Sequence, residues 1–408
     1  MPLAIPMLEQ PNSDAIVLKE YEDLTINLTD EDAQFLSSHL ANKIAVRRHI
    51  EGPFFTLNPA QYVGVITLPS GRRVECRPKI PISSLFYMLA VAFQLPPFRS
   101  EIVALERVDQ VFEFVANVFA DLVEERIGNG LYRWYVEKEE NVATIRGRIN
   151  FTEDVRQNHI LRQRMSCRFD EFTWDIPENQ IVRQVSHFLS GWRFLPETRL
   201  RLGQIDAELA EVTRTQFTTT DVDKIHYHRL NEDYRHLHQL CRLFLEGASL
   251  SETFGTFNFR AFLLDMNKLF ESFVCQILQE RARRGRLRVD SQERVYLDQE
   301  KKLAMRPDIL IRRTGRVLLS GDCKYKRLDR DDFKNHDQYQ LLAYCTATNS
   351  RQGLLVYPLH LKSSRSSLKI VNRDICIRQV TIDLGLEFKE LIQSCDKFAD
   401  EVLAYAEG

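Results

Sequence analysis

The hydrophobic pattern of the chain changes period twice, and this change most restricts the folds that its 408 residues can adopt. Apolar residues alternate with polar ones in short runs before residue 82, recur at three- and four-residue steps through the middle, and alternate again toward the C-terminus. A period of two indicates strands, and a period of 3.6 indicates helices. We therefore predict an α+β multidomain protein with a β-rich N-terminal domain over 1–100, a helical arm over 101–255 and a C-terminal α/β domain over 256–408.

Local signals predict individual elements in the first two domains. The runs 62–68 and 73–80 flank a Pro-Ser-Gly turn and predict a hairpin. Thr29, which is followed by three acidic residues, predicts the start of a helix. The apolar stripe of 108–130 predicts a long helix that ends at a glycine. We expect the middle of the chain to be entirely helical, with further helices over 82–95, 177–191, 201–213 and 228–246.

The C-terminal domain is expected to contain a sheet covered by helices. A helix is predicted over 261–280, and three strand-like runs follow it, the last two joined at Thr314-Gly315. Another helix is predicted over 331–348, and strands follow over 351–359 and 376–384. This order of elements is typical of an α/β sheet.

Two acidic residues and a lysine stand at a constrained spacing in this domain. Asp308 follows Pro307 at the start of one predicted strand. Asp322 and Lys324 lie in the next strand, where the alternation places both on one face and Cys323 on the other. Two carboxylates at one sheet edge repel each other unless a divalent cation lies between them. We therefore expect Asp308 and Asp322 to bind Mg²⁺, which prefers oxygen ligands, and Lys324 to assist a water that attacks a phosphodiester.

Three further residues are candidates for the same site. Glu271 lies on the border of the apolar stripe of the predicted helix 261–280, where its carboxylate can face the sheet as another metal ligand. Gln340 and Tyr344 lie four residues apart on the helix 331–348, so that both side chains can point at one edge. The predicted catalytic residues are Asp308, Asp322, Lys324, Glu271 and Gln340, and the predicted metal ligands are Asp308, Asp322 and Glu271.

The charge around this motif suits a nucleic-acid substrate. The whole chain is nearly neutral, with 55 Lys and Arg against 57 Asp and Glu, which excludes a protein that coats nucleic acid by its bulk charge. Residues 281–330, in contrast, hold 16 Lys and Arg against 7 Asp and Glu. A basic stretch around acidic metal ligands is what binding to a phosphate backbone requires. The local charge therefore favours a nuclease.

The motif resembles the PD-(D/E)xK nuclease pattern, and longer blocks make the resemblance narrower. They are similar to the McrC family, the nuclease subunits of McrBC 5-methylcytosine restriction systems. The likeness runs from about residue 60 to 360, and Cys323 stands where a small residue such as Ala is usual in the family. The first sixty residues and the C-terminal tail carry no matching motif. The similar blocks are 62–80, 169–184, 262–278, 305–313, 321–328 and 337–344.

The resemblance implies a Mg²⁺-dependent DNA endonuclease subunit of a type IV, modification-dependent restriction complex. Its partner in the family is a McrB-like AAA+ GTPase hexamer, which binds GTP, recognises double-stranded DNA carrying modified cytosine, and is stimulated by McrC. This sequence contains no GxxxxGK[ST] phosphate loop, so we expect the chain itself to bind no nucleotide. By the same resemblance, the N-terminal and helical regions form a stalk that enters the central pore of the hexamer.

Two other functions remain open at this point. One is a non-catalytic adaptor that activates an AAA+ motor and keeps the nuclease-like domain for DNA binding alone. The complete set of two acids and a lysine argues against it, because an adaptor has no reason to keep like charges together. The other is a stand-alone PD-(D/E)xK nuclease of DNA repair, against which the large helical insertion argues.

Several remaining features favour structural interpretations. The longest apolar run, 85–93, is about half of what a membrane-spanning helix needs, and no secretory signal is apparent, so we expect a cytoplasmic protein without membrane contact. The eight scattered cysteines predict free thiols. Asp175 is expected to cap the helix 177–191. Four histidines are expected to lie at the surface or to pack between helices: His226, His228, His236 and His238. Four arginines are expected to be ordinary surface charges, although arginines near hairpins can reach a partner's acidic loops: Arg47, Arg48, Arg72 and Arg73.

Overall fold

The chain forms two compact units, the second inserted into the first. The computed structural model describes residues 15–50, 52–95, 107–160, 163–249, 261–326, 335–359, 366–371 and 374–407. The first unit combines residues 1–112 with 260–408, and the second consists of 113–259. The first and last predicted domains are thus grouped in one unit. The boundaries predicted after residues 100 and 255 fall outside the described residues.

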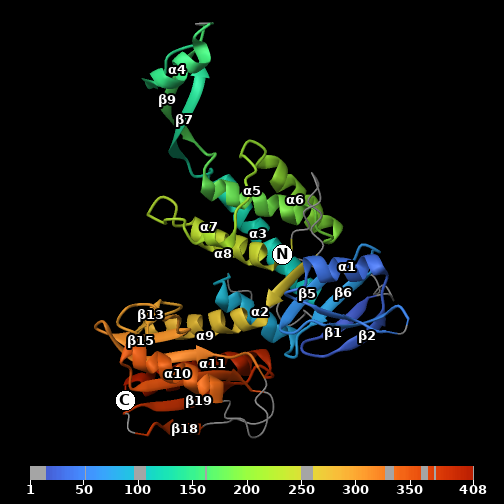
Figure 1. Ribbon diagram of the computed structural model, residues 1–408, viewed down its shortest axis with the longest axis vertical. Helices are drawn as coiled ribbons and strands as arrows, with labels where there is room; N and C mark the ends of the chain where they lie inside the picture. The colour runs from blue at the N-terminus through green and yellow to red at the C-terminus, as the bar shows by residue number, and fades with distance from the viewer. Residues whose placement is uncertain are drawn as a thin grey trace. The chain divides into compact units, whose positions relative to one another are not determined.

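The first unit begins with a sheet that joins strands of the first eighty residues to residues 261–265 (Figure 1). Its strands in this unit are ordered β1-β6-β5-β11, with β1 parallel to β6 and the other pairs antiparallel. The hairpin of β5 and β6 is confirmed. Gly64 of β5 has φ 154°, and a Cβ there would lie 2.0 Å from the carbonyl oxygen of Phe262, so glycine permits β11 to pair. The strands span Ile16–Lys19 (β1), Arg73–Arg77 (β6), Tyr62–Thr67 (β5) and Ala261–Asp265 (β11).

The strand β11 corrects the predicted helix over 261–280. Ala261, Phe262, Leu263 and Leu264 are all buried, and they extend the N-terminal sheet instead of beginning a helix. Asp265 then caps the helix α9, Met266–Ala282, by accepting a hydrogen bond from the backbone amide of Asn267 at 3.0 Å. A short run of consecutive apolar residues fits either a buried strand or a helix, and the pairing with β5 decides between them.

A second small sheet and two helices complete the N-terminal part. The strands are ordered β2-β4-β3, and the helix α1 packs with both sheets around one apolar core. Thr29 accepts a hydrogen bond from the backbone amide of Asp32 at 3.1 Å, so the predicted helix start is confirmed. The bounds are Leu24–Asn27 (β2), Asp30–His39 (α1), Ala45–Arg48 (β3), Phe54–Asn58 (β4) and Ile82–Ala92 (α2).

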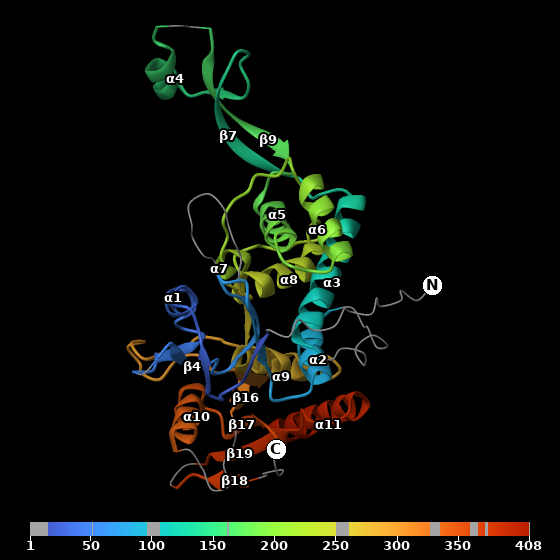
Figure 2. The ribbon, with the colours of Figure 1, turned by 90° about the vertical axis from the view of Figure 1, so that its right-hand side faces the viewer.

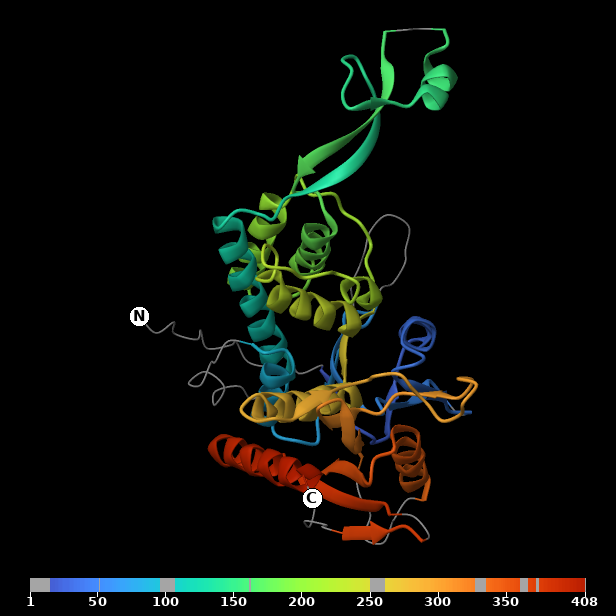
Figure 3. The same ribbon diagram turned by 90° about the vertical axis from the view of Figure 1, so that its left-hand side faces the viewer.

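The C-terminal part of the first unit is a mixed sheet with helices on both faces, as an α/β arrangement requires. Its order is β12-β15-β16-β17-β19-β18, antiparallel between β15 and β16 and parallel from β16 through β17 to β19. Leu355 packs with α10, whereas its neighbour Leu354 lines a cavity with α11, so these helices cover opposite faces (Figure 3). The bounds are Arg288–Asp290 (β12), Ile309–Arg313 (β15), Arg316–Cys323 (β16), Asn335–Thr348 (α10), Gln352–Pro358 (β17), Ser366–Lys369 (β18), Cys376–Ile382 (β19) and Phe388–Glu407 (α11), with a two-stranded ribbon of Val295–Tyr296 (β13) and Ala304–Met305 (β14).

The second unit is not entirely helical, which corrects the prediction for the middle of the chain. A three-stranded sheet, ordered β7-β9-β8, extends away from the helices of this unit and carries α4 beside it (Figure 2). Its strands lack the alternating apolar pattern because they bury little surface. The sheet comprises Trp134–Val142 (β7), Arg148–Ile149 (β8) and Met165–Thr173 (β9), and the helices are Val108–Gly128 (α3), which begins in the first unit, Phe151–Asn158 (α4), Pro177–Ser190 (α5), Pro196–Glu208 (α6), Thr219–Val222 (α7) and Tyr234–Gly247 (α8).

Buried polar residues join the helices of the second unit. Asn179 accepts a hydrogen bond of 2.6 Å from the Tyr234 hydroxyl, and His238 lies between the Tyr227 hydroxyl and the carbonyl oxygen of Glu178, both at 2.9 Å. Burial lowers the pKa of His238 to about 4, so the imidazole is neutral, as the packing interpretation requires. Asp175 accepts hydrogen bonds from Thr213 and Gln180. The prediction that it caps α5 is wrong, because Ile176 is the N-cap residue and no side chain caps this end.

Two general expectations can be compared with the structure. None of the described helices is long and apolar enough to cross a bilayer. All eight cysteines lie in the described residues, and none forms a disulfide, so the prediction of free thiols is confirmed.

Candidate active site

The strands β15 and β16 place Asp308 and Asp322 side by side. Ile309 pairs with Gly321, so Asp308, just before β15, lies next to Asp322 near the end of β16. Both acids are buried, with exposed fractions of 8% and 1%. Oδ2 of Asp308 accepts a hydrogen bond of 2.8 Å from the backbone amide of Cys323.

Lys324 continues this strand and faces Asp322. Its Nζ lies 2.7 Å from Oδ2 of Asp322, and its backbone amide donates a hydrogen bond of 2.9 Å to the carbonyl oxygen of Val356 in β17. Burial lowers the pKa of Lys324, but attraction to Asp322 outweighs it, and the pKa lies above its usual value. The lysine is therefore held as an ammonium beside the acids.

Glu271 reaches the same place from α9, and Gln292 connects it to Asp308. Nε2 of Gln292 donates to Oε1 of Glu271 at 2.5 Å and to Oδ1 of Asp308 at 2.8 Å. The backbone of Gln292 has φ 54°, and its amide donates to the carbonyl oxygen of Pro307 at 3.1 Å, which fixes the turn against the start of β15. One amide nitrogen thus bridges two of the three predicted metal ligands.

Burial, with help from neighbouring charges, raises the pKa values of all three carboxyl groups. Burial and the charges of Glu271 and Asp322 raise the pKa of Asp308 to about 8. Burial also raises the pKa values of Asp322 and Glu271, and the charge of Asp322 adds to the effect on Glu271. Buried acids in this condition are stabilised by protons, by hydrogen-bond donors or by a cation.

The carboxylate oxygens of this site are ligands that suit Mg²⁺, although the three acids are not arranged around a common metal position. Among the described residues, no group of three His, Cys, Asp or Glu side chains is arranged to hold a metal ion. Two of the three acids are instead bridged by Gln292, and the third is paired with Lys324. All the same, these three carboxylates, of which Asp308 and Asp322 are buried and Glu271 is partly buried, provide the oxygen ligands that Mg²⁺ prefers.

Gln340 approaches the acids only through Tyr344. Its Nε2 donates a hydrogen bond of 2.7 Å to the Tyr344 hydroxyl. Burial and the charges of Asp322 and Asp308 raise the pKa of Tyr344, which places this hydroxyl near the acids. The structure therefore brings Asp308, Asp322, Lys324 and Glu271 together directly, with Gln340 one residue further away.

Sequence reasoning missed Gln292 and a second buried acid, Asp337. Asp337 on α10 pairs with Lys326 and accepts a hydrogen bond of 2.8 Å from the Tyr357 hydroxyl. Burial raises the pKa of Asp337, but these partners outweigh it and the pKa is lowered. Asp337 lies in the block 337–344, which resembles the McrC family, so its place in that block could have indicated a functional role. Gln292 lies in a turn outside every similar block and had no such indication.

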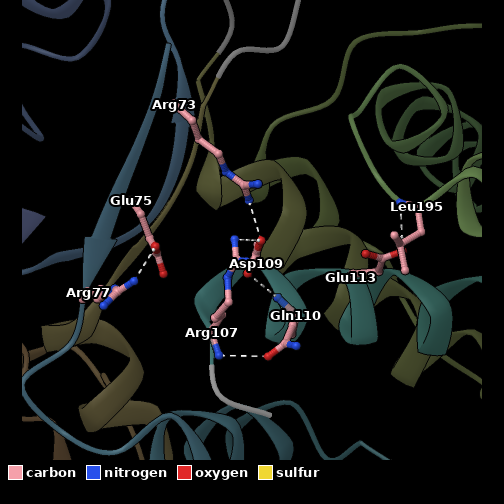
Figure 4. A network of polar contacts seen from close by, with 8 residues as sticks. All are labelled: Arg73, Glu75, Arg77, Arg107, Asp109, Gln110, Glu113 and Leu195. Atoms are coloured by element: carbon pink, nitrogen blue, oxygen red, sulfur yellow. Dashed lines mark hydrogen bonds and ion pairs between the residues drawn. The ribbon is translucent and has the colours of Figure 1, made fainter. Parts of the chain in front are cut away.

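The four candidate arginines of the N-terminal part all have partners in the first unit. Figure 4 shows Arg73 reaching Asp109 at the start of α3, with 2.9 Å between Nη2 and Oδ2. Arg72 donates a hydrogen bond of 2.9 Å to the carbonyl oxygen of Asn27. Arg47 pairs with Asp23 at 3.1 Å, and Arg48 with Asp30 at 3.6 Å. These contacts agree with ordinary structural roles.

Comparisons with known proteins agree over most of the chain. A family model described as "McrBC 5-methylcytosine restriction system component" matches residues 57–358. A relative from Escherichia coli K12, described as "Type IV methyl-directed restriction enzyme EcoKMcrBC", is 24% identical over 356 residues, which are 80% of this chain and 99% of the relative. A solved structure described as a half-complex of Thermococcus gammatolerans McrB AAA+ hexamers with bound McrC contains a similar chain. That chain is 19% identical with a TM-score of 0.55, and the match covers 95% of this chain and all of that one, so the two share a fold.

Proposed function

The chain belongs to the family of McrBC 5-methylcytosine restriction system components, and from this premise we propose that it is the DNA-cleaving subunit of such a system. The observation that carries the proposal is the cluster of the buried Asp308 and Asp322 with the partly buried Lys324 at one sheet edge, and with Glu271 facing it. Buried like charges cost stability, so a cluster of this kind is typical of a site that works on a charged substrate.

The residues of the cluster have separate roles in phosphodiester hydrolysis. Asp308, Asp322 and Glu271 would hold Mg²⁺, which when bound neutralises the phosphate and polarises a water molecule. The amide of Gln292, which bridges Glu271 and Asp308 in the structure, would have to release them for the ion to bind between the acids. Lys324, held by Asp322, directs its ammonium at the phosphate and stabilises the negative charge that grows there.

Exposed arginines of the C-terminal part suit a DNA backbone. Several basic residues of the region are paired with acids, such as Arg281 with Asp400 and Arg312 with Asp290. Others are exposed, and the described part of the chain contains no ion pair for them. Phosphate groups of DNA are the natural partners of such unpaired guanidinium groups. These exposed residues are Arg283, Arg284, Arg286, Arg294, Arg306 and Arg316.

The second unit offers a surface for a protein partner. Large apolar side chains are exposed along β7, β9 and α4, and Tyr135 and Phe172 pair across the two strands with their ring centroids 5.0 Å apart. Exposed apolar patches of this kind mark interaction sites. We assign this surface to the AAA+ GTPase hexamer, which would bind GTP and the methylated DNA. Its residues are Trp134, Tyr135, Ile145, Phe151, Val155, Ile160 and Phe172.

One reconstitution tests this function. The chain is mixed with the AAA+ partner encoded beside it, methylated double-stranded DNA, GTP and Mg²⁺, and the wild type is compared with Asp308→Ala. We expect the wild type to cut and the variant to fail, while both stimulate GTP hydrolysis by the partner to the same extent.

The other outcomes identify the alternatives. If neither protein cuts but both stimulate GTP hydrolysis, the chain is an adaptor. If the wild type cuts without any partner, it is a stand-alone nuclease. Cutting by Asp308→Ala at the wild-type rate would show that the assigned residues are wrong.

A further inference from the structure

A buried carboxyl group from the start of the chain contacts the residue that follows Lys324. Glu20, at the end of β1, is completely buried, and its Oε2 accepts a hydrogen bond of 3.2 Å from the Tyr325 hydroxyl and one of 2.8 Å from the backbone amide of Lys79. The neighbouring Tyr21 donates from its hydroxyl to the carbonyl oxygen of Tyr325 at 3.3 Å. Both the side chain and the backbone of Tyr325 are thus held by the N-terminal sheet.

Tyr325 touches the candidate active site on two sides. It directly follows Lys324, and its ring packs against Phe270 with the centroids 5.8 Å apart. Phe270 in turn precedes Glu271 on α9. A shift of Tyr325 would therefore move the backbone at Lys324 and the end of α9 that carries Glu271.

Packing alone gives no reason for a carboxyl group at this position. Oε1 of Glu20 is buried without a hydrogen-bond partner among the described residues, and burial raises the pKa of Glu20 to about 7. A buried acid with an unsatisfied oxygen destabilises the fold, and an apolar residue of similar size would avoid that cost. What the acid adds is two directional contacts, one with the backbone amide of Lys79 and one with the Tyr325 hydroxyl.

We propose that Glu20 and Tyr325 are positioning residues of the nuclease site, which hold Lys324 and Glu271 in the arrangement that cleavage needs. The N-terminal sheet is then part of the cleavage machinery as well as a neighbour of it. This inference rests on the proposed nuclease function. It adds two residues that act without contacting the DNA, Glu20 and Tyr325, which lie 305 positions apart in the sequence.

Three substitutions test the contact. Tyr325→Phe removes the hydroxyl and keeps the ring against Phe270, Glu20→Leu removes the acceptor, and Glu20→Gln keeps an acceptor oxygen. Single-turnover cleavage is measured at saturating DNA and Mg²⁺ with the partner and GTP, together with the DNA Kd and GTP hydrolysis. We expect the first two to slow cleavage about tenfold, as loss of supporting contacts around such sites does. The DNA Kd and the GTP hydrolysis should not change, and Glu20→Gln should restore cleavage to within about twofold.

A matched control separates positioning from stability. Asp32 is another completely buried acid of the N-terminal part, and it accepts a hydrogen bond of 3.0 Å from the backbone amide of Ser70. Asp32→Asn should leave the cleavage rate unchanged. The inference is wrong if Tyr325→Phe and Glu20→Leu cut at the wild-type rate, or if Asp32→Asn is slowed as much as they are. Wild-type cutting by Asp308→Ala would instead overturn the proposed function.

Discussion

The backbone amide of Cys323 donates a hydrogen bond of 2.8 Å to Oδ2 of Asp308. This bond crosses from β16 to the residue before β15 and fixes the direction of a buried carboxyl group. Because the donor is the main chain, the Cys323 side chain, which lies on the other side of the strand from Asp322, is free to differ between related chains.

Substitution of Cys323 by Ala should therefore leave cleavage within about twofold of the wild type, because the amide that holds Asp308 remains. Loss of the buried sulfur should lower the free energy of unfolding by roughly 1 kcal/mol. Cleavage assays measure the rate, and chemical denaturation measures the free energy of unfolding. A loss of cleavage as large as that of Asp308→Ala would show that the thiol itself takes part.

Replacement of Gln292 by Ala should change how the protein responds to Mg²⁺. The variant removes the donor that bridges Glu271 and Asp308, so the metal-free protein should melt at a lower temperature, and added Mg²⁺ should raise Tm by more than in the wild type. Thermal melts with EDTA and across a Mg²⁺ series measure both effects. Gln279→Ala is the control, because that amide donates to the carbonyl oxygen of Val289 and not to the acids. Equal Mg²⁺ shifts in all three proteins would contradict the bridging role.

Charged residues introduced on the exposed apolar surface of the second unit should weaken binding of the chain to its AAA+ partner. Phe151 and Val155 lie one turn apart on α4, with exposed fractions of 71% and 68%, so the double substitution to Asp should preserve folding. We expect stimulation of GTP hydrolysis to fall at least tenfold, since a desolvated charge at an interface costs more than about 1.4 kcal/mol. Leu200→Asp, equally exposed but on α6, should have no effect. A similar loss in that control would place the interface elsewhere.

Removal of the unpaired arginines should weaken DNA binding in a salt-dependent way. Each of Arg294→Ala and Arg306→Ala should lower the slope of log K against log salt by about 0.9, because one phosphate contact is lost. Anisotropy titrations without Mg²⁺ measure the slope while no DNA is cut. Arg281→Ala serves for comparison, since this arginine already pairs with Asp400, at 2.6 Å, and should change the slope less.

The buried Glu20 predicts how stability depends on pH. Folding raises the pKa of Glu20 from its ordinary value of 4.5 to about 7, so the folded state binds more protons than the unfolded state between these values. The acid therefore destabilises the fold progressively as pH rises from about 4.5 to 7, by roughly 3 kcal/mol at most. Glu20→Gln should gain stability relative to the wild type at pH 8 and not at pH 4. Denaturation at the two pH values tests this, and an equal difference at both would disprove the assigned pKa.

Much of the site could be predicted because its residues are close in the sequence. Asp308, Asp322 and Lys324 lie on two adjacent strands, so a period of two was enough to place them together. Glu271 could be predicted as well, because it lies on the border of the apolar stripe of its helix. Gln292 could not be predicted, because its position depends on a turn with positive φ and on a backbone contact with Pro307.

The errors in the fold have a common physical cause. Sequence periodicity reports which side chains face a core, and it fails where strands bury little or are buried completely. Strands β7 and β9 are mostly exposed and lack an apolar alternation, and β11 is buried on both faces and resembles a helix. The contact of Glu20 with Tyr325 joins residues with no sequence relation, so only the folded chain could show it.

The pairing of β5 with β11 has a consequence for protein synthesis. While the ribosome makes residues 113–259, the edge of β5 at Gly64 has no hydrogen-bonding partner strand. That partner, β11, is complete only when residue 265 has been made. Asp322 and Lys324 follow later still, so a chain that ends before residue 261 lacks both β11 and the residues of the proposed active site.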